Sequence, residues 1–376
     1  MKQLVNWELR RFFSKKYILI MALLLIALNV YIIYYEYDEY LNYAYLQENI
    51  NETLVNIEGD ITSEKTQSIE EKHQETLQLL KLDYESEEAH SNVNLHRSFY
   101  VKYLDYINDT PFPMEYSGEV YESKQEVIEA LKKYKKDSPT YFALNKYLSL
   151  VEKSNKENFY VMHWWEIFQQ NSLLFLMVVI IIAMATVFGE DYSGNGVYLT
   201  LSSKYGKTKL VKARIIAGAT FACFIFLAFY IVELINRLWL HGINGYQGNV
   251  SIIGFIYLPN ETPLTILALL AVFTMIASIC LAFFTMAVSL FTKRTILTMI
   301  TMVIIIFGAE MIKIPFISNL SLRDIINNFT NSFIYYEPIL VGKYVLHEPL
   351  YLFISLLLIT TLSLITILYK GKRQQL

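Results

Sequence analysis

The sequence comprises 376 residues, of which 54% are hydrophobic and 18% are charged; its mean hydropathy is +0.32 and its formal net charge is −3. This composition excludes an ordinary soluble globular protein. The apolar residues gather in runs of about 20, the length with which a helix crosses the hydrocarbon core of a bilayer. Both cysteines, Cys223 and Cys280, lie within such runs, so no disulfide framework is expected.

The chain begins with a short amphipathic segment. In residues 1–16 apolar side chains recur at helical spacing among lysines and arginines, which predicts a helix at the membrane interface. Its apolar face consists of Val5, Leu9, Phe12 and Phe13. Residues 17–35 form the first predicted span, because the run is too long for the apolar region of a signal peptide and no small-residue cleavage site follows it.

Residues 36–166 differ in composition and are predicted to form a mainly α-helical domain outside the membrane. This stretch holds 26 acidic and 13 basic residues. Residues 63–81 and 124–136 are rich in helix-forming residues and are predicted surface helices. Pro111 and Pro113 interrupt the helical pattern between them.

Five further spans are predicted after this domain. They cover residues 167–188, 215–240, 264–291, 296–314 and 350–369. A tight turn at residues 292–295 joins the fourth span to the fifth, and a basic tail, residues 370–376, ends the chain. The predicted fold class is therefore an all-α membrane protein: six transmembrane helices, an N-terminal interfacial helix and a large, mainly helical extracellular domain between spans 1 and 2.

The segment between the fifth and sixth spans, residues 315–349, is more apolar and aromatic than a solvated loop requires. It is predicted to contain short helices embedded in part in the membrane, and a folded external cap is an equal alternative. The residues that suggest such helices are Phe329, Phe333, Tyr335, Tyr336, Ile339 and Leu340.

The distribution of charge predicts the orientation of the six spans. The segments at residues 1–16, 189–214, 293–294 and 370–376 together hold 15 lysines and arginines against three acids, whereas the remaining 17 basic residues face 32 acids. Basic residues concentrate in cytoplasmic segments, so both termini are predicted to lie in the cytosol. The three acids are Glu8, Glu190 and Asp191.

No motif of an enzyme is present in the sequence. Gly206-Lys207-Thr208 matches the end of a phosphate-binding loop, but Leu201 occupies the position of its first glycine. His73, His90, His96 and His163 lack the spacing of metal ligands and are predicted to be surface residues. We therefore expect no catalytic, cofactor-binding or metal-binding residue in this chain, and no nucleic-acid partner.

Two pairs of ionisable residues fall near the predicted outer ends of spans. Glu233 and Arg237 are four residues apart, and Glu310 and Lys313 are three apart, so each pair can meet on one helix face. Charged groups are costly within a span and usually face protein or water. Ion pairs at the interface are the simpler interpretation, and contacts with cargo at an outer vestibule are the alternative.

The central basic segment carries a pattern seen in a known family. It begins with Gly189-Glu190, continues with Gly194-x-Gly196 and an apolar stretch, and ends with Ser202-Ser203 and a basic run at residues 207–212. With the N-terminal amphipathic helix and the six predicted spans, this pattern resembles the permeases of the ABC-2 family. The chain departs from the family in having Lys204-Tyr205 and Gly206-Lys207 where that family commonly has Pro and Ser-Arg.

The resemblance implies the membrane subunit of an ATP-binding-cassette transporter, which exports a hydrophobic or peptide-like cargo across a bacterial plasma membrane. It implies two protein partners, a separate ATPase subunit that binds ATP and Mg and a second permease subunit, identical or paralogous, besides membrane lipid. It also implies that residues 189–214 form a cytoplasmic coupling loop. The expected coupling residues are Glu190, Asp191, Gly194, Gly196, Lys207 and Lys212.

Two other classes of function remain open. The main alternative is a membrane receptor or sensor whose extracellular domain binds a ligand and signals to a cytoplasmic partner without transport. An ion-coupled carrier ranks last, because neither paired carboxylates near the bilayer midplane nor two repeats with broken helices are evident. For the loop itself, simple anchoring by anionic lipid headgroups is the alternative to coupling.

Overall fold

The computed structural model describes the larger part of the chain. The described residues are 1–44, 57–81, 87–107, 114–116, 119–121, 124–154, 156–160, 167–168, 172–193, 208–243, 245–253, 255, 257–311, 339–341 and 344–372.

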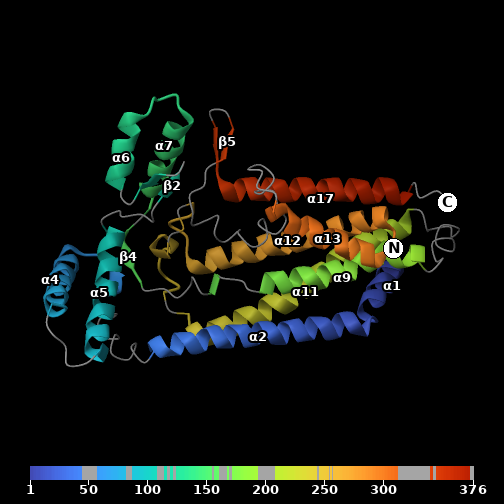
Figure 1. The fold of residues 1–376 in the computed structure, drawn as a ribbon, viewed down its shortest axis with the longest axis horizontal. Helices are drawn as coiled ribbons and strands as arrows, with labels where there is room; N and C mark the ends of the chain where they lie inside the picture. The colour runs from blue at the N-terminus through green and yellow to red at the C-terminus, as the bar shows by residue number, and fades with distance from the viewer. Residues whose placement is uncertain are drawn as a thin grey trace.

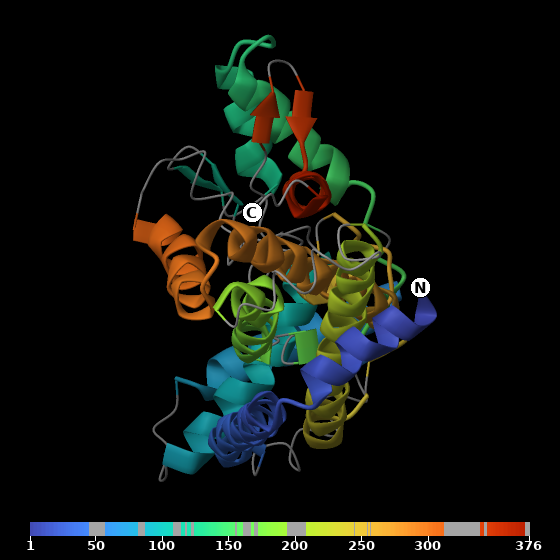
Figure 2. The same ribbon diagram turned by 90° about the vertical axis from the view of Figure 1, so that its right-hand side faces the viewer.

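Long helices lie side by side in one bundle (Figure 1). They are α2 (Lys16–Ala44), α9 (Ser172–Ser193), α11 (Lys209–His241), α12 (Pro263–Thr292), α13 (Thr295–Met311) and α17 (Glu348–Lys372). The short helix α1 (Lys2–Phe13) and the last turn of α17 lie at the same end of the bundle, which we call the N/C end. Figure 2 looks onto this end and shows α1 crossing it beside α11.

Five of these helices are long and apolar enough to cross a membrane, which indicates a multi-pass membrane protein. The stretches are Lys16–Tyr35, Leu174–Tyr192, Lys209–His241, Pro263–Thr292 and Glu348–Gly371. The predicted fifth span, 296–314, coincides with α13, which has 17 residues within the described part of the chain. Residues 312–314 lie outside the described ranges, so the count of six spans stays a prediction.

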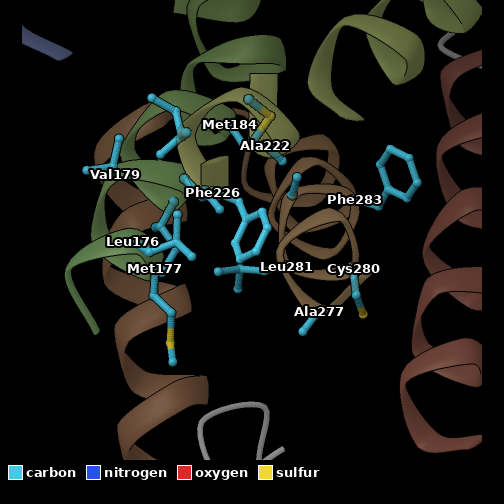
Figure 3. Packing of buried hydrophobic residues seen from close by; sticks show 14 of the residues in the cluster. Leu176, Met177, Val179, Met184, Ala222, Phe226, Ala277, Cys280, Leu281 and Phe283 are labelled. Carbon is cyan, nitrogen blue, oxygen red and sulfur yellow. The ribbon is translucent and has the colours of Figure 1, made fainter. Parts of the chain in front are cut away.

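Helix α12 occupies the centre of the bundle and packs against α9, α11, α13 and α17. Figure 3 shows side chains of α9 and α12, among them Met184 and Leu281, gathered near Phe226 of α11. Gly218 permits a close approach of α11, because a Cβ atom there would lie 2.9 Å from the sulfur of Met286. Cys280 is buried in this core and, like Cys223, is a free thiol.

The region between α2 and α9 contains further helices, which lie beyond the opposite end of the bundle (Figure 1). They are α4 (Ser63–Leu79), α5 (Glu87–Ile107), α6 (Lys124–Lys133) and α7 (Pro139–Val151). Helices α4 and α6 confirm the two predicted surface helices. Thr62 and Ser138 cap α4 and α7 by accepting hydrogen bonds from the backbone amides of Lys65 and Tyr141.

Short antiparallel strands accompany these helices. Strand β1 (Gly59–Asp60) pairs with β4 (Asn158–Phe159), with Gly59 opposite Phe159. Strand β2 (Met114–Tyr116) pairs with β3 (Glu119–Tyr121), just after the prolines that were expected to interrupt the helical pattern. The helices and strands of this region enclose two small apolar cores. One surrounds Tyr103 and Phe159 between α4, α5 and β4, and the other surrounds Leu144 and Tyr147 between α6 and α7.

The loop between α11 and α12, residues 242–262, connects both small cores to the bundle. It contains a short 3₁₀ helix at Val250–Ile253. Ile252 packs against the Tyr103 core as well as the bundle core, and Tyr257 packs against the Tyr147 core as well as the bundle core. The amide of Asn260 donates a 2.8 Å hydrogen bond to the carbonyl oxygen of Lys153. We call residues 242–262 the connecting loop.

Within residues 315–349, the described residues 339–341 and 344–346 form a β-hairpin, and α17 already begins at Glu348. Strand β5 (Ile339–Val341) pairs with β6 (Tyr344–Leu346) immediately before α17. Ile339 and Leu340, two of the residues that suggested short embedded helices, therefore lie in a strand. The β-branched residues Ile339, Val341 and Val345 and the aromatic Tyr344 favour such extended pairing. The other four residues of that prediction, Phe329, Phe333, Tyr335 and Tyr336, lie outside the described residues.

Candidate functional site

The amphipathic helix α1 is held against the bundle by its aromatic side chains. The ring of Phe12 lies 5.1 Å from that of Phe221, and the ring of Phe13 meets Phe224 edge to face at 5.2 Å. Val5 and Leu9 pack against the same core. The apolar face that was predicted to lie at the membrane interface is therefore covered to a large extent by α11, which leaves Trp7 and Arg10 exposed.

A group of six charged side chains joins α1 to α9 and α11 at the N/C end. Within it, the Nε atom of Arg214 donates a 2.8 Å hydrogen bond to Oε1 of Glu8, and Nη2 of Arg214 lies 2.5 Å from Oδ2 of Asp191. Arg214 in the second turn of α11 thus bridges α1 and the last turn of α9. Residues 8 and 214 are far apart in the sequence, so only tertiary folding brings them together.

Arg11 and Lys15 complete this arrangement from the other side of Glu190 and Asp191. The Nη2 atom of Arg11 donates to Glu190 at 3.2 Å and to Asp191 at 3.1 Å, and the Nζ atom of Lys15 donates to Glu190 at 2.6 Å. The members are Glu8, Arg11, Lys15, Glu190, Asp191 and Arg214, and we call them the charge network. Three positive and three negative side chains balance within it.

Two members of the charge network are almost completely buried. Glu8 is 0% exposed and Arg214 is 4% exposed, and the guanidinium of Arg214 lies 5.1 Å above the ring of Phe188. The Oε2 atom of Glu8 is buried without a hydrogen-bond partner among the described residues, and Nη1 of Arg11 lies 3.7 Å from it. A buried ion pair adds little stability over an apolar pair, but removal of one partner leaves a charge unpaired. The network therefore specifies how α1 meets α9 and α11.

Burial and the neighbouring carboxylates shift the pKa values of two bases in the network. Burial disfavours the charged form of Arg11, but Asp191, Glu8 and Glu190 outweigh it and raise the pKa of the guanidinium. Burial lowers the pKa of Lys15, against the opposing effect of its ion pair with Glu190. Arg11 consequently keeps its charge at every physiological pH.

Close backbone contacts fix the same end of the bundle. A Cβ atom at Gly189 would lie 2.7 Å from the backbone nitrogen of Thr295, so the end of α9 touches the start of α13. At Gly371 a Cβ atom would lie 3.2 Å from both methyl groups of Val211, so α17 ends against the first turn of α11. The N/C end is thus a tightly packed junction of α1, α9, α11, α13 and α17.

The structure brings together only some of the predicted coupling residues. Glu190 and Asp191 lie in the last turns of α9 rather than in a loop, and both belong to the charge network. Lys212 is exposed in the first turn of α11 and makes no contact with this network. Gly194, Gly196 and Lys207 lie outside the described residues.

Sequence reasoning missed Glu8, Arg11, Lys15 and Arg214 as members of one site. A signal was present in the charge count, because Glu8, Glu190 and Asp191 are the three acids of the segments predicted to be cytosolic. Isolated acids in strongly basic segments suggest that each acid forms a structural ion pair with a base. The pattern does not reveal which base each acid meets.

The predicted outer pair of α11 does form. The Nε atom of Arg237 donates a 3.3 Å hydrogen bond to Oε1 of Glu233, and each side chain is only about 3% exposed. Both side chains are therefore buried within the protein, and their charged groups do not extend toward the membrane surface. For Glu310 only the backbone is described, as part of α13, and Lys313 lies outside the described residues.

In the described ranges no group of three His, Cys, Asp or Glu side chains is arranged to hold a metal ion. The charge network therefore stands as the candidate functional site on its geometry. No family model matches the sequence, and no curated protein or solved structure matches it.

Proposed function

We propose that this protein is the permease subunit of an ATP-binding-cassette transporter of the ABC-2 type and that a separate subunit hydrolyses the ATP. The observation that supports this best is the charge network. It joins α1 to the two helices that flank residues 194–207, the segment predicted to meet the ATPase. A partner that moves this segment or α1 would therefore move α9 and α11 together.

The bundle offers a direct route from that junction to the opposite end. Helix α11 has 33 residues, which corresponds to about 50 Å at 1.5 Å per residue. Its first turns carry Arg214, and its last turn leads into the connecting loop, which contacts both small cores. In this proposal ATP-driven motion at the N/C end reorients α9 and α11 around α12. The acidic region 57–160 then gates or selects cargo on the other side.

The proposal includes a second permease subunit, identical or paralogous, that faces this one across the cargo path. ATP and Mg bind to the ATPase subunits, and membrane lipid surrounds the exposed faces of α2, α13 and α17. The direction is export, and the cargo is hydrophobic or peptide-like. Both termini lie in the cytosol of a bacterial cell, so the charge network faces the ATPase.

Affinity purification tests this function. The tagged full-length chain, extracted from its host in a mild detergent, should retain a subunit with a complete phosphate-binding loop, and the complex should hydrolyse ATP. Gly194→Leu should keep the complex assembled while it uncouples hydrolysis from movement of cargo. If no nucleotide-binding subunit co-purifies in several mild detergents, the proposal fails.

A receptor or sensor is the second candidate, and the connecting loop favours it. Ile252 links the Tyr103 core to the bundle, and Tyr257 links the Tyr147 core to it. Binding of a ligand to region 57–160 would therefore act on α11 and α12 directly. The same purification separates the two candidates. A sensor should co-purify with a signalling protein and show no ATP-dependent movement of any cargo in sealed vesicles.

A further inference from the structure

A second group of charged side chains lies at the N/C end of the bundle. Lys293 and Arg294 form the turn between α12 and α13, and Lys370 lies in the last turns of α17. Lys293 and Arg294 are exposed, and Lys370 is half-exposed. Within the described part of the chain, no carboxylate lies at ion-pair distance from any of the three. We call these residues the basic cluster.

Aromatic rings hold the two ammonium groups of the cluster. The Nζ atom of Lys370 lies 3.2 Å from the ring centroid of Phe291, and the Nζ atom of Lys293 lies 5.2 Å from that of Tyr192. Phe291 lies two residues before Lys293, so both ammonium groups lie at the turn between α12 and α13. Cation–π contacts fix the positions of ammonium groups but do not neutralise their charge. An anion bound at this turn would neutralise their charge.

The backbone at Lys293 supports a role beyond turn formation. Its φ angle is 56°, in the left-handed region, where it caps α12 with a hydrogen bond to Ser289. Glycine is the usual residue at such a position, because a side chain there is strained. Only this non-glycine residue adopts a positive φ among the described residues. The lysine side chain therefore occupies a position at which a glycine would form the same turn with less strain.

The three acids that the structure describes at the N/C end already have basic partners. Glu8, Glu190 and Asp191 are paired with Arg11, Lys15 and Arg214 in the charge network. The charge network is balanced, so the positive charge of the basic cluster remains in excess at this end of the bundle. Among the described residues no carboxylate remains to pair with the basic cluster, which leaves room for an anion from outside the chain.

The surroundings of the basic cluster identify the kind of anion. Large apolar side chains are exposed around it on the bundle surface, with Phe291 at 60% and Ile296 at 73% exposure. Further along α17, Ile365 and Tyr369 are also exposed. A free phosphate ion would use the cations alone. A phospholipid would use both, with its phosphate between the cations and its acyl chains along the apolar faces of α12, α13 and α17.

We propose that the basic cluster of Lys293, Arg294 and Lys370 binds the headgroup of an anionic phospholipid at the N/C end. The bound lipid would join the end of α17 to the α12–α13 turn, in place of a protein counter-ion. This inference does not depend on the transport function, because it concerns only the surface of the bundle and its surrounding membrane.

Lipid binding to the full-length protein tests the proposal. The protein in neutral detergent micelles is titrated with dioleoylphosphatidylglycerol or dioleoylphosphatidylcholine, and bound lipid is counted by native mass spectrometry. The wild-type chain should prefer the anionic lipid. Lys293→Gln/Lys370→Gln should weaken its binding about 30-fold, because each basic residue near an anionic surface contributes about 1 kcal/mol. The matched control is Lys2→Gln/Lys16→Gln, which removes two exposed charges elsewhere and should change binding little.

Several results would overturn the proposal. Equal binding of the two lipids by the wild-type chain would do so. A loss of binding in the control variant as large as in Lys293→Gln/Lys370→Gln would do so too, because it would indicate diffuse electrostatic attraction. If inorganic phosphate displaces the lipid at low millimolar concentration, the cluster is a phosphate site instead. Lys370→Glu places an acid beside Lys293 and should abolish binding of the anionic lipid. Retained binding in that variant, with a wild-type melting temperature in phosphatidylcholine, would equally contradict the assignment.

Discussion

Arg214 of α11 and Glu8 of α1 form a buried ion pair with a hydrogen bond of 2.8 Å, although the two residues are 206 positions apart in the sequence. The pair links α1 to α11. Glu8 is fully buried, and Arg214 also forms an ion pair with Asp191. A single residue of α11 thus connects the N-terminal helix to the end of α9.

Removal of one partner of this pair should be strongly destabilising. Arg214→Met removes the hydrogen-bonded counter-ion of the buried Glu8 carboxylate and leaves only the more distant Arg11, at 3.7 Å, which should cost about 3–5 kcal/mol. The double variant Glu8→Leu/Arg214→Met should recover much of the loss, because an apolar pair can replace a buried ion pair. Thermal unfolding in detergent measures both effects, with the exposed Lys212→Gln as control. A double variant less stable than Arg214→Met would show that the pair is not the main interaction of these residues.

Glycines at helix contacts should differ in their tolerance of alanine. At Gly189 the added Cβ would meet the backbone of Thr295 at 2.7 Å, whereas at Gly218 it would meet the flexible side chain of Met286. Overpacking costs about 1–3 kcal/mol, and we expect Gly189→Ala near the upper limit and Gly218→Ala near the lower. Melting temperatures of the two variants provide the comparison. A larger loss for Gly218→Ala would mean that the α9–α13 contact is not tightly packed.

Stability should fall when the pH decreases below about 6.5, the ordinary pKa of histidine. Burial, with smaller effects of Lys146 and Lys153, lowers the pKa of His347, and burial also lowers that of His96. A lowered pKa means that the unfolded chain binds the proton more readily, so the stabilisation is present above the unfolded pKa and is lost as the pH falls through the folded pKa. Hydrogen-exchange protection factors of β6 and the start of α17, corrected for the intrinsic exchange rate at pH 7.5 and at pH 5, report the change at His347.

The comparison variant for this effect is His347→Phe, which keeps a ring against Tyr257 but cannot bind a proton. It should show a much smaller loss of protection in β6 at pH 5, while His96→Phe should leave the protection of β6 unchanged. Unaltered pH dependence in His347→Phe would assign the effect to another group.

Labelling from each side of the membrane tests the orientation. In a Cys223→Ser/Cys280→Ala background, single cysteines at Ser63 and Ser202 should react with an impermeant thiol reagent from opposite sides. Ser63 is exposed at the start of α4, and Ser202 lies in the segment predicted to be cytosolic. Reaction of both positions from the same side would overturn the six-span orientation.

The helix ends show where the sequence pattern was insufficient. Hydropathy placed the end of the second span at residue 188 and the start of the third at residue 215, but α9 continues to Ser193 and α11 begins at Lys209. The reason is that a helix ends where its backbone hydrogen bonds end, whereas hydropathy ends where polar side chains begin. Glu190, Asp191 and Arg214 are polar residues on helices whose charge network satisfies them within the protein.

The sequence by itself determined the class of the protein, the approximate positions of five helices long and apolar enough to cross a membrane, the turn at Lys293 and Arg294, and the concentration of basic residues in four segments. These are local properties, because run length, periodicity and charge are each read within a few tens of residues. Only the tertiary structure decided that Glu8 meets Arg214, that Phe12 packs on Phe221, and that Glu190 and Asp191 lie with Arg11 and Lys15. Such pairings depend on how helices pack against one another, and many bases could satisfy each acid equally well by sequence.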